Sequence, residues 1–215
     1  DCTFGGGGYS KELLKLPNIK VIALDRDKSA ISRAKKLERD FPKHFTFYNE
    51  KFSNLEKVIK KGNKPDIIIF DLGLSTFQLQ DYSRGFSFKS NEKIDMQMGL
   101  TSLSAEDVVN KSDENSLKLI IKIFGDEKEA AKIAKNIIKA RKIKPITSVD
   151  ELVAIIEKSK KKNYKKKINV CTKTFQALRI FVNKEVTELI TGLIKATKLI
   201  KSGGKIIVVS FHSIE

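Results

Sequence analysis

Four consecutive glycines at positions 5–8 are followed by Asp25 at a spacing that suits a nucleoside-containing cofactor. Glycine lets the backbone approach a ligand closely, and amides at the start of a helix favour bound negative charge. Asp25 stands 17 residues after Gly8, at the end of the apolar run 21–25. A carboxylate there can accept hydrogen bonds from both hydroxyls of an adenosine ribose.

The glycine turn departs from the dinucleotide fingerprint G-x-G-x-x-G. Ser10 stands three residues after Gly7 and Lys11 stands three residues after Gly8, so the third glycine is absent. S-adenosylmethionine carries no phosphate and therefore fits this turn better than a dinucleotide does. An NAD-dependent oxidoreductase is the alternative from another enzyme class, and tighter binding of NAD than of S-adenosylmethionine would favour it.

The segments around this turn alternate between strand and helix patterns, which favours an α/β fold with a parallel sheet. The next strand after Asp71 comes more than 130 residues later, at 205–210, although a crossover needs about 30. Helical periodicity fills the interval and predicts an inserted all-helical domain. The residues before the glycine turn are expected to end a first strand, and those after it to start a helix. The other expected strands are 21–25, 45–49, 67–70 and 205–210, and the other expected helices are 27–40, 55–61, 105–110, 117–124, 127–141, 149–158 and 175–200.

Composition limits the partners of the protein. The 215 residues include 42 Lys and Arg against 26 Asp and Glu, a net charge of +16, which favours a nucleic acid or an anionic membrane surface. A solvated lysine-rich surface is the alternative. The sequence has no apolar stretch of about 18 residues and no signal peptide at its start, which favours a cytoplasmic protein without a membrane partner. Two histidines and the unpaired Cys2 and Cys171 predict no metal site.

Three features offer contacts to RNA, each with a plainer alternative. The segment 158–167 holds seven lysines and is either a phosphate-contacting loop or a solvated linker. Phe86 and Phe88 either stack on bases or pack at a domain boundary. His212 follows the last expected strand and either contacts RNA or forms a structural hydrogen bond.

Longer motifs resemble a known family. They are DCTFGGGGYS, IALDRD, DIIIFDLGLSTFQLQDYSRGFSF, IDMQM, TFQALRIFVNKE and IIVVSFHSIE. In this order and spacing they resemble the bacterial small-subunit (16S) ribosomal RNA cytosine-N4 methyltransferase family over nearly the whole chain, and the DLGLS block is far more specific than a glycine turn. The resemblance implies a Rossmann-like, S-adenosylmethionine-dependent methyltransferase domain with an inserted helical RNA-recognition domain. The helical periodicity places the methyltransferase domain at 1–84 and 184–215 and the inserted domain at 85–183.

The resemblance assigns a substrate and residue roles. The implied substrate is a cytidine in the decoding centre, methylated on its exocyclic N4, so the partner is small-subunit ribosomal RNA or the small ribosomal subunit. Asp25 would hold the ribose and Phe52 would pack on adenine. Asp71 and Gln78 would line the opening between cofactor and base. The full set of implied cofactor contacts is Gly7, Gly8, Tyr9, Asp25, Phe52, Asp71 and Gln78.

Methyl transfer to nitrogen needs alignment of the reacting atoms rather than a covalent nucleophile. Methylation at carbon 5 of cytosine needs an attacking cysteine, and neither Cys2 nor Cys171 lies in a strand-end Pro-Cys context. The N4 lone pair is conjugated with the ring, so a carboxylate that accepts an N4 proton would assist the attack. Asp71 is the catalytic candidate, and the alternative is that it only orients the loop or the cofactor.

Some positions depart from the family pattern. Tyr9 stands where histidine is usual, Thr76 and Phe77 replace Ser-Pro, and 169–173 replaces a His-Pro-Ala-Thr-Arg stretch. The chain begins and ends inside family motifs, so we expect an upstream segment and the last strands of the sheet to be missing. A catalytically impaired RNA-binding fragment is therefore a further alternative.

Overall fold

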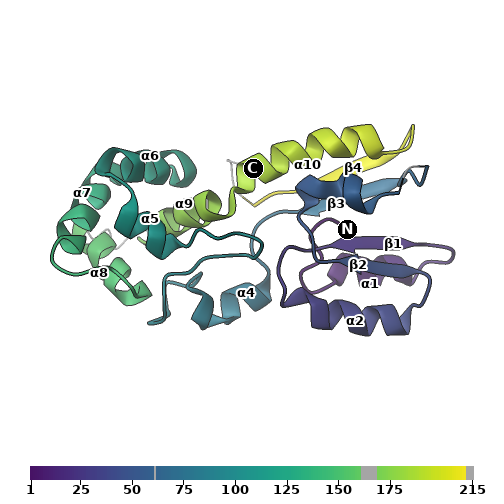
Figure 1. The fold of residues 1–215 in the computed structure, drawn as a ribbon, viewed down its shortest axis with the longest axis horizontal. Helices are drawn as coiled ribbons and strands as arrows, with labels where there is room; N and C mark the ends of the chain where they lie inside the picture. The colour runs from purple at the N-terminus through teal and green to yellow at the C-terminus, as the bar shows by residue number, and fades with distance from the viewer. Residues whose placement is uncertain (61, 161–168, 212–215) are drawn as a thin grey trace. The chain divides into compact units, whose positions relative to one another are not determined.

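The computed structural model describes residues 1–60, 62–160 and 169–211. Most of the lysine run 158–167 and all of His212 lie outside the described residues, so both interpretations of each stay open. The chain divides into two compact units, residues 1–77 with 185–215 and residues 78–184 (Figure 1). The predicted insertion, 85–183, falls within the second unit.

The first unit combines short parallel strands with helices (Figure 1). Strand β1 (Val21–Leu24) pairs with β2 (Phe45–Tyr48), and β3 (Ile67–Asp71) pairs with β4 (Lys205–Val209), both in parallel. The strands predicted at 21–25, 45–49, 67–70 and 205–210 are confirmed to within one residue at their ends, whereas the residues before the glycine turn, expected to end a first strand, form no strand. The helical elements of this unit are α1 (Gly8–Leu14), α2 (Ala30–Asp40), η1 (Phe52–Asn54), α3 (Leu55–Val58) and α10 (Glu185–Leu199), and the division between the units falls within α4 (Thr76–Gln80).

The segment before the glycine turn joins the two strand pairs. The Cys2 N–H donates to the Ile69 carbonyl (2.8 Å), and the Phe4 N–H donates to the Leu24 carbonyl (2.9 Å). This segment therefore lies between β1 and β3 and bonds to both. The glycine turn that follows this segment lies near the carboxyl ends of β1 and β3, where Asp25 and Asp71 stand. α/β folds bind their ligands at the carboxyl ends of parallel strands.

Over its described residues, 78–160 and 169–184, the second unit consists of helices and connecting loops, including the long helix-free segment 85–104; one isolated bridge joins Lys93 and Ser148. Phe86 is buried beneath the Arg84 guanidinium, and Phe88 packs edge-on against Phe175 with ring centroids 6.2 Å apart. Both contacts lie within the second unit, so they show that the rings pack there, and neither packing at a domain boundary nor stacking on bases is tested. The elements are η2 (Tyr82–Arg84), α5 (Ala105–Lys111), α6 (Glu114–Gly125), α7 (Ala130–Arg141), α8 (Val149–Ser159) and α9 (Thr172–Asn183).

The prediction of a single helix over 175–200 is wrong, because two helices, α9 and α10, occupy this segment. Lys184 adopts a left-handed conformation (φ 52°) and separates α9 from α10. The Asn183 side chain accepts a hydrogen bond from the Met98 N–H (2.8 Å) and donates one to the Met96 carbonyl (2.7 Å). These bonds to a distant loop stabilise the end of α9, and periodicity within 175–200 carries no trace of them.

Replacing Gly125 by alanine is expected to lower the free energy of unfolding by about 1–3 kcal/mol, the usual cost of overpacking. A Cβ on Gly125 would collide with the Lys173 carbonyl and lie 3.2 Å from the Ala177 Cβ, where α6 meets α9. Alanine is the better helix former, so the sign of the change tests this contact. Urea unfolding measures it, and Gly8→Ala, whose Cβ would meet nothing within 4 Å, is the matched control.

Candidate cofactor and active site

The glycine turn leaves the strands through a tight, left-handed path. Gly5 and Gly7 have positive φ angles of 51° and 77°, which side chains disfavour. A Cβ on Gly7 would also lie 2.8 Å from the Phe4 ring, so this glycine lets Phe4 pack beneath the turn. Gly8 begins α1 beside open space, and Tyr9 is exposed next to it. A ligand can therefore approach the backbone at Gly8.

The Asp25 carboxylate, immediately after β1, is bonded to the turn. Its Oδ2 accepts from the Gly5 N–H (2.6 Å) and its Oδ1 accepts from the Asp27 N–H (2.8 Å). Each carboxylate oxygen can accept a further hydrogen bond. Burial raises the pKa of Asp25, whereas these amide bonds and the Arg33 charge oppose the rise. The carboxylate is thus positioned to accept from a second pair of donors.

Phe52, in η1 after β2, lies at the same edge of the first unit. Its ring meets Phe70 edge-on with centroids 5.4 Å apart, and a Cβ on Gly192 of α10 would lie 2.7 Å from it. The neighbouring Lys51 forms an ion pair with Glu188 of α10 (3.4 Å). These contacts fix the position of the half-buried ring, and its packing on adenine stays a prediction.

Asp71 ends β3 and connects to the same turn segment. Its N–H donates to the Thr3 hydroxyl (2.7 Å), and its Oδ1 is buried. Thr3 and Gly5 are two residues apart and bond the ends of β3 and β1, so one short segment holds both acids at one edge. Gln78 is buried in α4 but belongs to the second unit, and an opening lined jointly by Asp71 and Gln78 stays a prediction.

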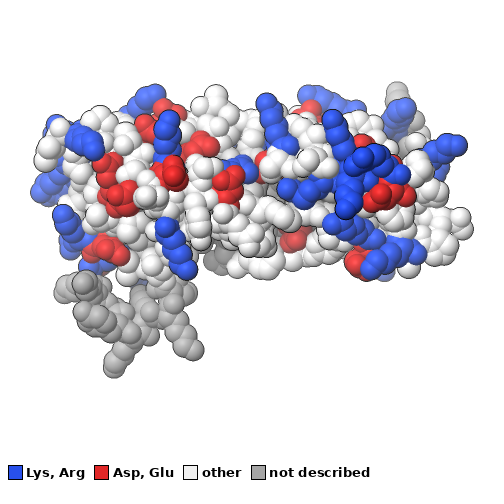
Figure 2. Space-filling view, turned by 90° about the horizontal axis from the view of Figure 1, so that it is seen from below, with Lys and Arg blue, Asp and Glu red and all other residues white. Residues whose placement is uncertain are grey.

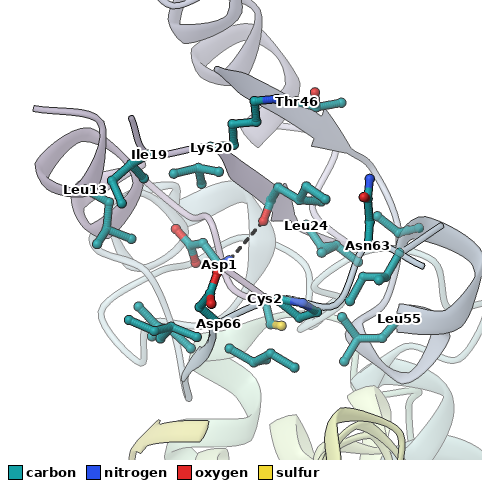
Figure 3. A pocket seen from close by; sticks show the side chains of 18 of the residues that line it. Asp1, Cys2, Leu13, Ile19, Lys20, Leu24, Thr46, Leu55, Asn63 and Asp66 are labelled. Carbon is teal, nitrogen blue, oxygen red and sulfur yellow. Dashed lines mark hydrogen bonds between the residues drawn. The ribbon is translucent and has the colours of Figure 1, made fainter. Parts of the chain in front are cut away.

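A cavity in the first unit does not involve these residues. It has a volume of about 610 Å³ and runs along β1, β2 and β3 beside Asp1 and Cys2 (Figure 3). Its lining includes apolar strand residues together with Lys20, Thr46 and Asp66. None of the seven predicted cofactor contacts lines it. The cavity therefore gives no support to the predicted cofactor site.

Sequence reasoning missed three residues that hold the turn. Thr3 bonds Asp71, the Arg33 Nε donates to the Gly5 carbonyl (3.1 Å), and the Phe77 ring covers Gly6. Arg33 is one of only six arginines and lies on the helix directly after Asp25, a position that could have drawn attention to it. Thr3 and Phe77 carry no comparable signal, because their contacts are distant in sequence.

Two negative findings apply to residues 1–60, 62–160 and 169–211. Within them, no three His, Cys, Asp or Glu side chains are grouped so as to hold a metal ion. No helix in that part of the chain is long and apolar enough to cross a membrane.

Comparison with known proteins gives consistent matches. A model of the MraW methylase family matches residues 1–215. The chain is 46% identical over its whole length to Ribosomal RNA small subunit methyltransferase H of Orientia tsutsugamushi (strain Ikeda), covering 70% of that protein. It is 43% identical to the proteins of the same name from Ehrlichia canis (strain Jake) and Rickettsia africae (strain ESF-5), covering 73% and 69% of them. With the whole chain matched at these identities, the protein belongs to the MraW methylase family and is a methyltransferase.

Proposed function

We propose that this protein methylates the exocyclic N4 of a cytidine in the decoding centre of small-subunit (16S) ribosomal RNA, with S-adenosylmethionine as methyl donor. The family implies an S-adenosylmethionine-type cofactor, and the relatives are named for small-subunit ribosomal RNA. The observation that carries the proposal is the segment from Thr3 to Gly5, which bonds the ends of β3 and β1. It ties Asp71 and Asp25, which follow or end two different strands, to one short segment of the chain.

The residues at this edge fit the cofactor. Asp25 keeps acceptor capacity for the ribose hydroxyls, and Gly8 stands beside open space that Gly7 and Tyr9 flank. Phe52 would present its ring to the adenine. When bound, S-adenosylmethionine supplies a methyl group on a positively charged sulfur, which leaves as a neutral thioether.

The two cysteines support nitrogen rather than carbon 5 as the methyl acceptor. Attack at carbon 5 requires a thiolate. Cys2 and Cys171 are both buried, and burial raises the pKa of each thiol to about 11. Neither side chain is therefore prepared to act as a nucleophile, whereas N4 methylation needs none.

Asp71 would act on the N4 proton. A carboxylate that accepts a hydrogen bond from the amine localises the lone pair as the nitrogen attacks and then takes the proton. The Thr3 hydroxyl accepts the Asp71 N–H and steadies the end of β3. The remaining contribution of the protein is alignment of nitrogen, methyl and sulfur, and such positioning is worth up to about 7–11 kcal/mol.

Charge supports an RNA substrate. The chain carries +16, and α2 exposes Lys35, Lys36 and Arg39. Figure 2 shows Lys and Arg side chains gathered near this helix, with acidic side chains among them. The helical segment 85–183 is proposed to recognise the RNA, and a ribosomal substrate would place the reaction in the cytoplasm. Cations displace counterions from the RNA backbone, so binding is expected to weaken with salt.

The deciding experiment is methyl transfer from labelled S-adenosylmethionine to small ribosomal subunits that lack the modification. Digestion and mass spectrometry of the RNA then identify the modified nucleoside. N4-methylcytidine at one position supports the proposal, and a different methylated nucleoside contradicts it. RNA binding without methyl transfer would indicate a catalytically impaired RNA-binding fragment instead.

A further inference from the structure

Two side chains from separate helices meet over the glycine turn. The Arg33 guanidinium, on α2, lies 4.4 Å from the centroid of the Phe77 ring, on α4. The same guanidinium donates from Nε to the Gly5 carbonyl (3.1 Å). The Phe77 ring lies so close to Gly6 that a Cβ there would be 2.8 Å from Cε2. All four residues belong to the first unit.

We propose that Arg33 and Phe77 form a clamp that positions the glycine turn for S-adenosylmethionine. The inference rests on the proposed function and extends it to two residues that sequence reasoning did not assign. Neither is a catalytic residue. Arg33 acts through Gly5, whose N–H holds the carboxylate of Asp25. Phe77 acts by packing on Gly6 and on Arg33.

Gly5 shows why the clamp reaches the cofactor site. Its N–H bonds the Asp25 carboxylate and its carbonyl bonds Arg33, so side chains hold both sides of one residue. Gly5 also has a positive φ of 51°, and a glycine has little intrinsic preference for such a conformation. Without Arg33 the turn would sample other conformations, and Asp25 would lose a partner that fixes its orientation.

Phe77 holds Arg33 in place. The ring is 48% exposed, so burial alone does not fix its position. Its face lies against the guanidinium, an arrangement in which a planar cation is attracted to the ring. Gly6 completes the fit, because any side chain there would push the ring off the turn.

Binding of S-adenosylmethionine to purified variants, measured by calorimetry, tests the clamp. Arg33→Lys keeps the charge but cannot both stack in plane and donate from the Nε position. Phe77→Leu keeps apolar volume but has no ring face. We expect each to raise the Kd for S-adenosylmethionine by about 3- to 10-fold. Gly6→Ala is expected to act in the same direction by displacing the ring. Turnover at saturating cofactor should stay within about twofold of wild type, because the clamp acts on binding.

Two controls separate positioning from loss of fold. Phe77→Tyr retains the ring and is expected to bind within about twofold of wild type. Leu79→Ala removes an exposed apolar side chain from the same helix and should leave the Kd unchanged. Thermal unfolding of every variant shows whether the fold is intact.

The outcomes distinguish this inference from the proposed function. Phe77→Leu or Arg33→Lys binding as tightly as wild type would overturn the clamp, as would equal weakening by Phe77→Leu and Phe77→Tyr. Tighter binding by Phe77→Leu would also overturn it, because the ring would then obstruct the site. If wild type binds no S-adenosylmethionine, the proposed function itself fails.

Discussion

Asp25→Asn is expected to weaken S-adenosylmethionine binding by at least about 100-fold, because hydrogen bonds to a charged group contribute about 1.5–3 kcal/mol each. The carboxylate accepts the Gly5 and Asp27 amides and still has capacity for both ribose hydroxyls. Asparagine offers one acceptor oxygen and would turn an NH₂ group toward one of these donors. Calorimetric titration with S-adenosylmethionine and with S-adenosylhomocysteine measures the loss, and both ligands should be affected because both carry the ribose.

Asp40→Asn is the matched control, since Asp40 is an exposed carboxylate at the end of α2. The Asp40→Asn variant should bind S-adenosylmethionine with the affinity of the wild type. An Asp25→Asn variant that binds within about threefold of wild type would remove Asp25 from the cofactor site. The size of the effect also separates Asp25 from the clamp, whose members act on the cofactor only through the turn.

The raised pKa of Asp25 predicts a pH dependence of the same binding step. Burial raises this pKa above the ordinary value of 3.8, against the opposing effects of the Asp27 and Gly5 amides and of the Arg33 charge. Only the ionised form accepts from both hydroxyls. As pH falls through the raised pKa, wild-type affinity should therefore decrease, whereas the weak affinity of Asp25→Asn should not change. Titrations over the range in which circular dichroism reports an intact fold measure this difference.

The strands and their terminal acids could be predicted because the relevant pattern is local. Runs such as 67–70 are apolar throughout and are followed by an acidic residue. The strand pattern and the end of the strand are therefore both visible within a few adjacent residues. A parallel sheet that contained both strands would place Asp25 and Asp71 at one edge, and in the structure the Gly5 and Thr3 bonds tie the two strand ends to one segment. The glycine turn could be predicted for the same reason, since its four consecutive glycines lie within the first ten residues.

Contacts between distant segments could not be predicted in this way. The break at Lys184 depends on hydrogen bonds from Asn183 to the 96–98 loop, and the sequence within 175–200 does not predict these bonds. Phe77 was visible only as a departure from a family pattern, although its ring lies on Gly6. Pairing of a turn with a residue some 70 positions away is a property of the folded chain, and one sequence contains no covariation to reveal it.

Asp71→Asn is expected to lower turnover by about 10²- to 10⁴-fold, the usual contribution of a positioned general base, while the Kd for S-adenosylmethionine changes by less than about threefold. The amide cannot take the N4 proton, yet the main-chain bonds that hold the end of β3, including the Asp71 N–H to Thr3, remain available. Single-turnover methyl transfer to small ribosomal subunits measures the rate, and calorimetry measures cofactor binding on the same preparations.

Asp66→Asn is the control, because it removes the same charge from a residue next to the same strand. Asp66 directly precedes β3 at its amino end, and its carboxylate forms an exposed ion pair with Lys201 (2.8 Å). Because the pair is exposed to solvent, its loss should leave methyl transfer unchanged. If Asp71→Asn lost rate and cofactor affinity in equal measure, Asp71 would be a residue that orients the cofactor or its loop. A selective loss of rate would instead assign the N4 proton to the carboxylate at the end of β3, on the same turn segment that holds Asp25.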